Sequence, residues 1–317
     1  MATLSWYRRL NESTLKLPSF AKINRTLRVL GKRPDGFHEI DSNLQTVSLH
    51  DELTFTPRDD QEIVLNCDTP GIPTDSSNLI LRAALALRRL VPEASGVSVQ
   101  LTKHIPAQGG LGGASSNAAV TLLALNQLWR AGLDHGRLQD LASQLGSDVP
   151  FFFWGGSGRA KGTGTVITML PDEPKSYLII VTPNAKVSTS IAYTALKAPS
   201  LTTQGSVSIL SSSFADPPFG DHDQRALYND FEGVIFEIEP EIKRAKLALL
   251  EAGAQGGLMA GSGSSVFGTF EKESERERAL KVLRRETGWQ VFSCNTISRA
   301  EYCEALNSIG FPILTLS

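Results

Sequence analysis

The sequence has few cysteines and few histidines. Its 317 residues include three cysteines, an odd number, and five histidines. Cys67, Cys294 and Cys303 lie far apart, no C-x-x-C pair occurs, and the histidines do not cluster. Neither a disulfide framework nor a zinc site is indicated. A reducing compartment is the simplest interpretation, so we expect a cytoplasmic protein.

An excess of charge is also absent. Lys and Arg number 31, Asp and Glu number 33, and the formal net charge is −2, which provides no basic field for nucleic acid or an anionic membrane. No apolar run approaches the length of a membrane span, and residues 1–18 contain none of signal-peptide length. We expect 1–18 to be a short extension, because its brevity and Glu12 argue against a transit peptide. Small molecules are the expected partners of a monomer or homodimer.

The composition that remains is that of a globular protein, with 41% hydrophobic and 20% charged residues. The length allows one large or two ordinary domains. Composition changes near 171–174, where we place a boundary between an N-terminal half, 19–170, and a C-terminal half, 175–310. The polar stretch 198–223 is the longest candidate loop.

Hydrophobic periodicity and turn residues predict a mixture of strands and helices. The order of elements in the second half is typical of an α+β domain with an antiparallel sheet. Strands are expected at 26–30, 37–49, 53–55, 63–65, 97–101, 177–181, 266–270 and 289–292, and helices at 78–90, 118–129, 134–145, 227–238, 240–252 and 274–286.

The most informative stretch is 106–117, in which four glycines fall within five positions and two serines and an asparagine follow. Glycine tolerates positive φ and lets the backbone approach another group closely. Ser115, Ser116 and Asn117 are good helix N-caps, and an apolar helical pattern begins at Ala118. A glycine loop that enters a helix N-terminus presents free N–H groups and the positive end of a helix dipole, which suits a phosphate.

Other interpretations of this loop are weaker. A tight turn before a buried helix would not need so many glycines. No Lys-Ser or Lys-Thr follows them, as in a P-loop, and no G-x-G-x-x-G frame fits the stretch. The residues alone therefore indicate an anion site without naming the anion.

One carboxylate stands in an unusual setting. Asp148 follows a predicted helix end and precedes Pro150 and three phenylalanines, so it is either solvated at a loop edge or held for a purpose. A helix C-terminus disfavours its charge, and a positive partner would be needed to keep it ionised. Lys22 is a candidate, because Lys22 and Asn24 alternate with Ala21 and Ile23 on a predicted strand. A strand lysine is more often solvated.

The loop resembles the P-x-x-x-G-L-G-S/G-S-S motif of the GHMP kinase superfamily, which includes galactokinase, homoserine kinase and mevalonate kinase. Two further segments resemble the 4-diphosphocytidyl-2-C-methylerythritol kinase family within it. They are A-K-I-N at 21–24 followed by G-K-R-P-D-G-F-H-E at 31–39, and G-S-D-V-P-F-F at 146–152. The segment G-S-G-S at 261–264 resembles the third motif of the superfamily. Together the motifs reach from residue 19 to residue 264 in the order of the family.

The resemblance implies a two-domain GHMP kinase fold of the α/β (α+β) class. Its N-terminal part is a ribosomal-protein-S5-like α/β domain and its C-terminal part a ferredoxin-like α/β sandwich, with the substrates in the cleft between them. The implied reaction is ATP-dependent phosphorylation of the 2-hydroxyl of a cytidine-diphosphate-linked methylerythritol in non-mevalonate isoprenoid synthesis. ATP and Mg²⁺ are the implied cofactors, and no metal ligand is assigned.

The resemblance also implies roles for individual residues. Asp148 would accept the hydroxyl proton, Lys22 would pair with it and stabilise the alkoxide, and Asn24 would hold the methylerythritol. Phe37 and His38 would contact cytosine, with Thr182 and Pro183 lining the same pocket. The turn at Gly261, Ser262 and Gly263 would support the loop or the substrate diphosphate. The ATP phosphates would be bound by Lys103, Pro106, Gly109, Gly110, Leu111, Gly112, Gly113, Ala114, Ser115 and Ser116.

Two positions depart from the family pattern. Phe37 replaces a usual tyrosine, which keeps the ring but loses a hydroxyl, and Arg25 stands where an apolar residue is usual. We expect Arg25 to face solvent or to pair with an acid. The alternatives that stay open are a related kinase acting on a small alcohol such as homoserine, for which the Phe37-His38 pair has no obvious use, and a catalytically silent binding module, which would need no proton acceptor.

Overall fold

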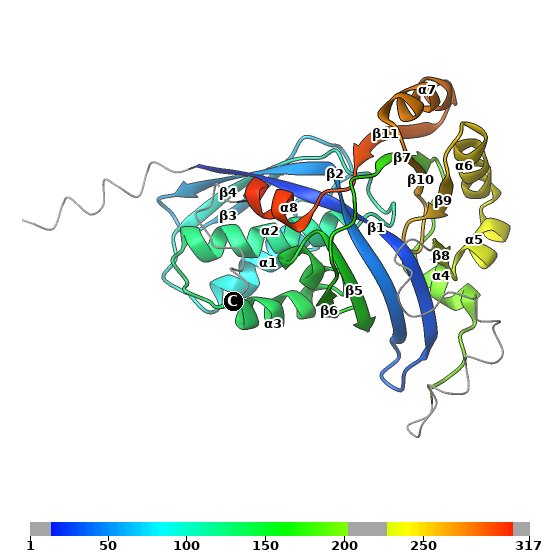
Figure 1. Ribbon diagram of the computed structural model, residues 1–317. Coiled ribbons are helices and arrows are strands. Elements are labelled where there is room, and N and C mark those ends of the chain that lie inside the picture. The colour runs from blue at the N-terminus through cyan, green and yellow to red at the C-terminus, as the bar shows by residue number, and fades with distance from the viewer. Residues whose placement is uncertain (1–13, 202–226, 307–317) are drawn as a thin grey trace, which may run out of the picture.

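The computed structural model describes residues 14–201 and 227–306, which form two β-sheets flanked by helices (Figure 1). The first sheet has the strand order β3-β4-β2-β1-β8, with β5 and β6 added beside β2, and the second has the antiparallel order β11-β7-β10-β9. The first sheet comprises β1 (Leu15–Lys32), β2 (His38–Arg58), β3 (Ile63–Cys67), β4 (Gly96–Thr102), β5 (Ser157–Gly162), β6 (Val166–Met169) and β8 (Tyr228–Asn229). The second comprises β7 (Tyr177–Pro183), β9 (Gly256–Met259), β10 (Val266–Phe270) and β11 (Trp289–Asn295).

The longest strands are β1 and β2, of 18 and 21 residues, which pair with each other in antiparallel fashion. The expectation of separate strands at 37–49 and 53–55 is wrong, because β2 runs through both. The residues between the two ranges, His50, Asp51 and Glu52, are polar. The Asp51 carboxylate is nevertheless fully buried and hydrogen-bonded there, so the strand continues. Residues 15–18 of the expected extension likewise belong to β1.

Three helices gather on one face of the first sheet (Figure 1): α1 (Leu79–Arg88), α2 (Gly113–Leu128) and α3 (His135–Leu145). The predicted helices at these places are confirmed, but two starts differ. Asn78, the first residue of the expected range, is the N-cap of α1 and accepts from the Ile80 N–H, so the helix itself begins at Leu79. The expected caps Ser115, Ser116 and Asn117 lie inside α2, because the left-handed Gly112 turns the chain into the helix before them.

The second sheet is covered on one face by α6 (Pro240–Glu251) and α7 (Glu273–Leu283), with α5 (Glu232–Ile238) beside α6. Both predicted helices in this region form. The helix expected at 227–238 begins only after β8, whose two residues pair with β1. The sequence did not predict α4 (Thr189–Leu196), a short helix with a single buried residue, Ala192. The expected loop 198–223 lies mostly outside the described residues.

A separate hydrophobic cluster joins the two sheets. Alternate residues of β7 enter different cores: Ile179 and Val181 face α6 and α7, whereas Leu178 and Ile180 pack with Ala21 of β1. The predicted alternation on β1 is confirmed, since Ala21 and Ile23 belong to this cluster and Lys22 and Asn24 point to the other face. Strand β1 therefore contributes to the packing between the halves as well as within the first.

The last described helix, α8 (Arg299–Leu306), returns to the first half. Tyr302 is fully buried, and its hydroxyl donates to the Phe152 carbonyl. A Cβ at Gly155 would lie 2.3 Å from the Tyr302 ring, so the backbone lies directly on the ring. Along the chain, β6 of the first sheet ends at Met169 and β7 of the second sheet begins at Tyr177. The later elements β8 and α8 nevertheless pack onto the first half.

Tyr302→Ala should therefore lower the free energy of unfolding by about 3–5 kcal/mol, the usual loss for a large buried ring. The reason is the cavity left against Gly155 and Phe152. Urea denaturation followed by tryptophan fluorescence measures the loss, and Glu304→Ala, an exposed residue of the same helix, is the control. Equal stability of the two variants would contradict the packing described here.

Candidate active site

The glycine-rich loop connects the end of β4 to the start of α2 and is held from both sides. The Lys22 N–H donates to the Leu111 carbonyl at 2.9 Å, and the Ser265 N–H donates to the Gly109 carbonyl at 3.2 Å. Lys22 belongs to β1 of the first sheet, whereas Ser265 lies in the turn between β9 and β10 of the second. The loop is thus fixed between the two halves of the chain.

Protein atoms occupy the space where side chains would stand on this loop. A Cβ at Gly110 would lie 2.0 Å from the Ala260 carbonyl oxygen, and one at Gly112 would lie 2.9 Å from the Phe152 ring and 3.0 Å from Lys22 Cγ. Both glycines also have positive φ, +75° and +71°. The space beside Gly112 is therefore filled by Phe152 and Lys22.

The first turn of α2 presents unpaired N–H groups. The first helical hydrogen bond runs from the Ser116 N–H to the Gly112 carbonyl at 2.8 Å, so the N–H groups of 113–115 have no acceptor within the helix. Ala114 is exposed and Ser115 half-buried, which leaves this turn accessible. An anion such as a phosphate fits here without any side-chain cap.

Lys22 and Asp148 form an ion pair beside the loop. The Lys22 ammonium lies 3.3 Å from Asp148 Oδ2, and the side chains are 4% and 36% exposed. Asp148 precedes a 3-10 helix, Val149–Phe153, whose residues are all buried. The sequence left open whether Asp148 is solvated or held. The structure places it in contact with Lys22 at the edge of accessible space, with one oxygen available to a ligand.

Asn24 is a second partner of the Lys22 ammonium. Lys22 Nζ donates to Asn24 Oδ1 at 2.7 Å, and Asn24 Nδ2 donates to the Ser42 hydroxyl at 2.8 Å. Ser42, fully buried in β2, in turn donates to the Thr26 carbonyl at 2.6 Å. The amide of Asn24 therefore has a defined orientation. Ser42 is a supporting residue that sequence reasoning missed, since a strand serine carries no distinguishing signal.

Phe37 and His38 lie at the turn between β1 and β2. Phe37 is 61% exposed, so it is not a core residue. The His38 ring stacks on Tyr193 of α4, with centroids 4.5 Å apart and planes at 27°. Burial, together with the nearby Lys32 charge, lowers the pKa of His38 from its ordinary value. Its ring is therefore neutral at pH 7, able to donate from one nitrogen and accept at the other.

Tyr193 was not predicted as a site residue, because nothing in the sequence marked α4 as a helix near the loop. Burial, and then the negative charge of Asp148, raise the pKa of Tyr193 to about 12. Its hydroxyl thus stays protonated, and it lies within electrostatic reach of the Lys22–Asp148 pair. Tyr193 stacks on His38, and the charge of Asp148 acts on its hydroxyl.

A cavity of about 1150 Å³ lies between the two halves, next to the residues that lead from β4 into the loop. Thr182 and Pro183 line this cavity together with Lys103 and Pro106, whereas Phe37 and His38 are not part of its lining. The structure therefore does not bring Thr182 and Pro183 into the same pocket as the aromatic pair. Apolar contributions to the lining come from Leu49, Ile72, Ile105, Ala185, Trp289 and Phe292.

The second glycine turn packs against the first. A Cβ at Gly261 would lie 3.0 Å from the Gly110 carbonyl oxygen, and the Ser262 hydroxyl contacts the Thr189 hydroxyl at 3.1 Å. Asn229, missed from the sequence, donates to the Gly261 carbonyl and to the Met259 carbonyl, both at 2.8 Å. Of the two roles that the resemblance left open for 261–263, these contacts favour support of the loop.

Two charged residues of the sequence analysis have structural partners. Arg25 pairs with Glu173 at 2.7 Å, so it is paired with an acid, which is one of the two environments expected for it. Lys103 is only 9% exposed and pairs with Asp51 at 2.8 Å, which directs its ammonium inward. Within 14–201 and 227–306, no three His, Cys, Asp or Glu side chains stand close enough to hold a metal ion. Nor is any helix of these ranges long and apolar enough to cross a membrane.

Comparison with known proteins agrees with this geometry. Residues 78–156 match the model of the GHMP kinases N terminal domain, and residues 217–288 match that of the GHMP kinases C terminal. The first match contains the glycine loop and Asp148, and the second contains the turn at 261–263. The fold and the site define a small-molecule kinase of the GHMP class.

The 4-diphosphocytidyl-2-C-methyl-D-erythritol kinase of Syntrophus aciditrophicus (strain SB) is 39% identical over 285 residues, which are 89% of this chain and 99% of that protein. The chain belongs to the 4-diphosphocytidyl-2-C-methyl-D-erythritol kinase family. A crystal structure of 4-(cytidine 5'-diphospho)-2C-methyl-D-erythritol kinase superposes with a TM-score of 0.71 at 32% identity, covering 89% of this chain and 99% of that one. The L. major mevalonate kinase, at 12% identity and a TM-score of 0.66 over 91% and 97% of the chains, shares the fold.

Gly112→Ala should lower kcat by up to about 10²-fold, because the new methyl group displaces the Lys22 side chain and misplaces its ammonium. Gly132→Ala is the matched control, since Gly132 has a similar φ of +64° but no atom within 4 Å of an added Cβ. Both variants carry the same backbone strain of about 1–2 kcal/mol. Steady-state phosphorylation rates and melting temperatures distinguish them. Equal kcat losses would show that backbone strain, and not the contact with Lys22, is responsible.

Proposed function

We propose that the chain transfers the γ-phosphoryl group of ATP to the 2-hydroxyl of 4-(cytidine 5'-diphospho)-2-C-methyl-D-erythritol and releases ADP. The observation that carries this proposal is the Lys22–Asp148 pair beside an anion-binding helix start. A phosphoryl transfer needs a phosphate cradle, charge compensation and a group that positions or deprotonates the acceptor. Here the start of α2 would be the phosphate cradle, Lys22 of β1 would compensate charge, and Asp148, just before the 3-10 helix, would position or deprotonate the acceptor.

In the proposed reaction, Asp148 accepts the proton of the acceptor hydroxyl, which its solvent-facing side can reach. The Lys22 ammonium, held by Asn24, lies where charge develops on the hydroxyl oxygen as the proton leaves. Because Lys22 is almost fully buried, water screens this charge little. Asn24 itself is occupied with Lys22 and Ser42, so its contribution to the acceptor is through Lys22.

The proposed ATP site combines the first turn of α2 with the adjoining cavity. The free N–H groups of 113–115 suit the phosphates, and the cavity has room for the rest of a nucleotide, with apolar walls for a base. Mg²⁺ would neutralise phosphate charge in this class of reaction, and it usually binds through substrate phosphates, water and one or two carboxylates. No residue of this chain is assigned to it.

The cytidine would lie against the aromatic group made by Phe37, His38 and Tyr193. Phe37 offers an exposed ring face, and the neutral His38 offers a donor and an acceptor for a base edge. A kinase of homoserine or mevalonate would have no base to place there. This group is the feature that favours the cytidyl substrate over a small alcohol, and the Lys22–Asp148 pair is the feature that favours an enzyme over a binding module.

A direct experiment is ATP consumption with the cytidyl substrate, homoserine and mevalonate offered separately to the full chain. Turnover with the cytidyl substrate alone supports the proposal. Turnover with homoserine or mevalonate alone would show that the acceptor is that alcohol and not the cytidyl substrate. ATP binding without turnover on any alcohol would favour the binding module. We further expect a cytoplasmic monomer or homodimer, to be tested by fractionation and light scattering.

Asp148→Asn should lower kcat by about 10²–10⁴-fold, the usual contribution of positioned proton transfer. The amide keeps the shape of the side chain but accepts a proton poorly, so the Michaelis constants for both substrates should change little. Initial rates at varied substrate concentrations give these constants. A fall in kcat of less than about threefold, far outside that range, would remove Asp148 from the role of base.

Phe37→Ala should weaken the cytidyl substrate by roughly 5- to 150-fold, since stacking on a base contributes about 1–3 kcal/mol. ATP affinity and melting temperature should stay nearly unchanged, because the ring is mostly exposed. Leu90→Ala, at an exposed apolar residue after α1, is the control for loss of surface hydrophobicity. If both ligands weaken in parallel with a lower melting temperature, Phe37 is structural and the base contact rests on His38 and Tyr193.

A further inference from the structure

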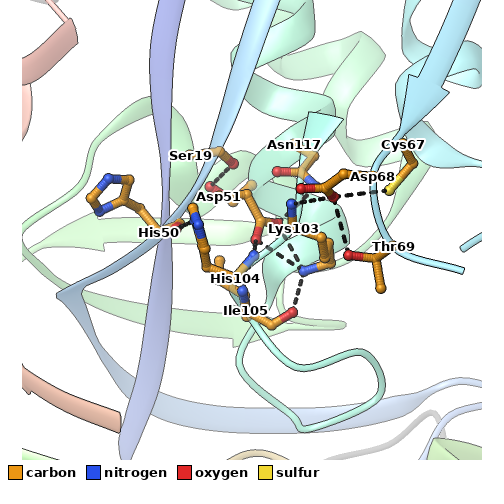
Figure 2. A network of polar contacts seen from close by, with 11 residues as sticks. Ser19, His50, Asp51, Cys67, Asp68, Thr69, Lys103, His104, Ile105 and Asn117 are labelled. Atoms are coloured by element: carbon orange, nitrogen blue, oxygen red, sulfur yellow. Dashed lines mark hydrogen bonds and ion pairs between the residues drawn. The ribbon is translucent and has the colours of Figure 1, made fainter. Parts of the chain in front are cut away.

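Asp51 of β2 has a carboxylate without solvent exposure, and its oxygens accept hydrogen bonds from four groups (Figure 2). Oδ1 accepts from the backbone N–H groups of His104 and Ile105 at 2.8 and 2.7 Å. The Lys103 ammonium donates to Oδ1 at 3.1 Å and to Oδ2 at 2.8 Å. Asn117 Nδ2 donates to Oδ2 at 3.0 Å.

These donors come from both ends of the glycine-rich loop. Residues 103–105 lead into the loop from β4, and Asn117 lies in α2, the helix that leaves it. Figure 2 shows the two groups converging on the one carboxylate. Asp51 therefore joins the entrance of the loop to its exit. By doing so it sets the span that 106–112 must close.

The charges explain why a carboxylate stands here. The Lys103 ammonium lies 3.3 Å from the position that a Cβ would take at Gly113, the first residue of α2. The start of a helix carries a partial positive charge, so a cation there is unfavourable without a negative partner. Burial of an ion pair is costly and is weak evidence for stability. The pair therefore says more about the geometry of the loop ends, which it fixes, than about the stability of the fold.

We propose that Asp51 is a positioning residue for the nucleotide. By tying residues 103–105 to Asn117, it holds the N–H groups of 113–115 in the arrangement that binds the triphosphate. Asp51 acts through these groups, since its own oxygens are buried and fully used. The inference rests on the proposed function, because it takes ATP as the ligand of the loop.

Asp51→Asn tests the proposal, because asparagine keeps the shape and one acceptor oxygen but turns an N–H₂ group toward Lys103 or Asn117. We expect the dissociation constant for ATP to rise about 10- to 100-fold, as buried donors lose their acceptor. Adenosine, which has no phosphate to place at the N–H groups of 113–115, should weaken less than about threefold. The cytidyl substrate should behave like adenosine. Calorimetry well below the melting temperature measures all three, and the Michaelis constant for ATP should rise more than kcat falls.

Two further variants keep the test decisive. Arg276→Gln removes another buried charge, on α7, where Arg276 pairs with Glu273 and Glu277 at 2.8 Å. It should lower the melting temperature without selective loss of ATP. Asn117→Ala removes only the link to α2, and Asn117 Oδ1 has no partner to lose. It should fold even if Asp51→Asn does not, with a smaller loss of ATP and the same sparing of adenosine.

The outcomes separate this inference from the proposed function. Selective loss of ATP in Asp51→Asn, or in Asn117→Ala if the former does not fold, supports it. Losses of ATP and adenosine that are equal and follow the melting temperature make Asp51 merely structural and overturn it, as does unchanged ATP affinity. If the unaltered chain binds no ATP at all, the proposed function fails first, and the inference fails with it.

Discussion

The contact between two backbone turns is the constraint on which the site depends. The glycine-rich loop and the turn at 260–265 approach so closely that a methyl group at Gly110 would overlap the Ala260 carbonyl. This contact brings the second sheet against the start of α2, and it leaves the N–H side of the loop free. The glycines thus serve the packing of protein on protein, and the proposed phosphate site is on the face that this packing leaves open.

A good part of this arrangement could be predicted from the sequence. The helices of the first half, the alternation along β1 and the glycine loop all follow from local patterns that the structure keeps, because each pattern coincides with a buried face. The Lys22–Asp148 contact needed more. Residues that far apart carry no pairing signal in a single sequence, so the residues alone made Lys22 only a candidate partner, and the resemblance to the family connected the two more firmly before the structure did.

The rest could not be predicted, for identifiable reasons. Helix α4 is short and buries one side chain, so its periodicity is faint, and Tyr193 gains its importance only from stacking on His38. Asp51 lies in the polar stretch His50-Asp51-Glu52 between two apolar runs, where acids are normally exposed. Its role is visible only when the ends of the loop converge on it. Thr182 and Pro183 lie at the end of β7. The path of that strand, which the sequence does not give, places them at the cavity between the halves and not beside Phe37 and His38.

Strand β1 belongs to every core of the molecule. Leu17 packs under the helices of the first half, Ala21 and Ile23 between the sheets, and Leu27 with the helices of the second. Because this one continuous strand packs into all three clusters, the two halves are joined by a shared strand and not by a flexible linker alone. The register of β1 with β2 shifts at three places, between Phe20 and Ala21, between Asn24 and Thr26, and between Val29 and Gly31. Two of these irregularities lie next to Lys22 and Asn24, so a bend of β1 at either of them would move the proposed reacting groups.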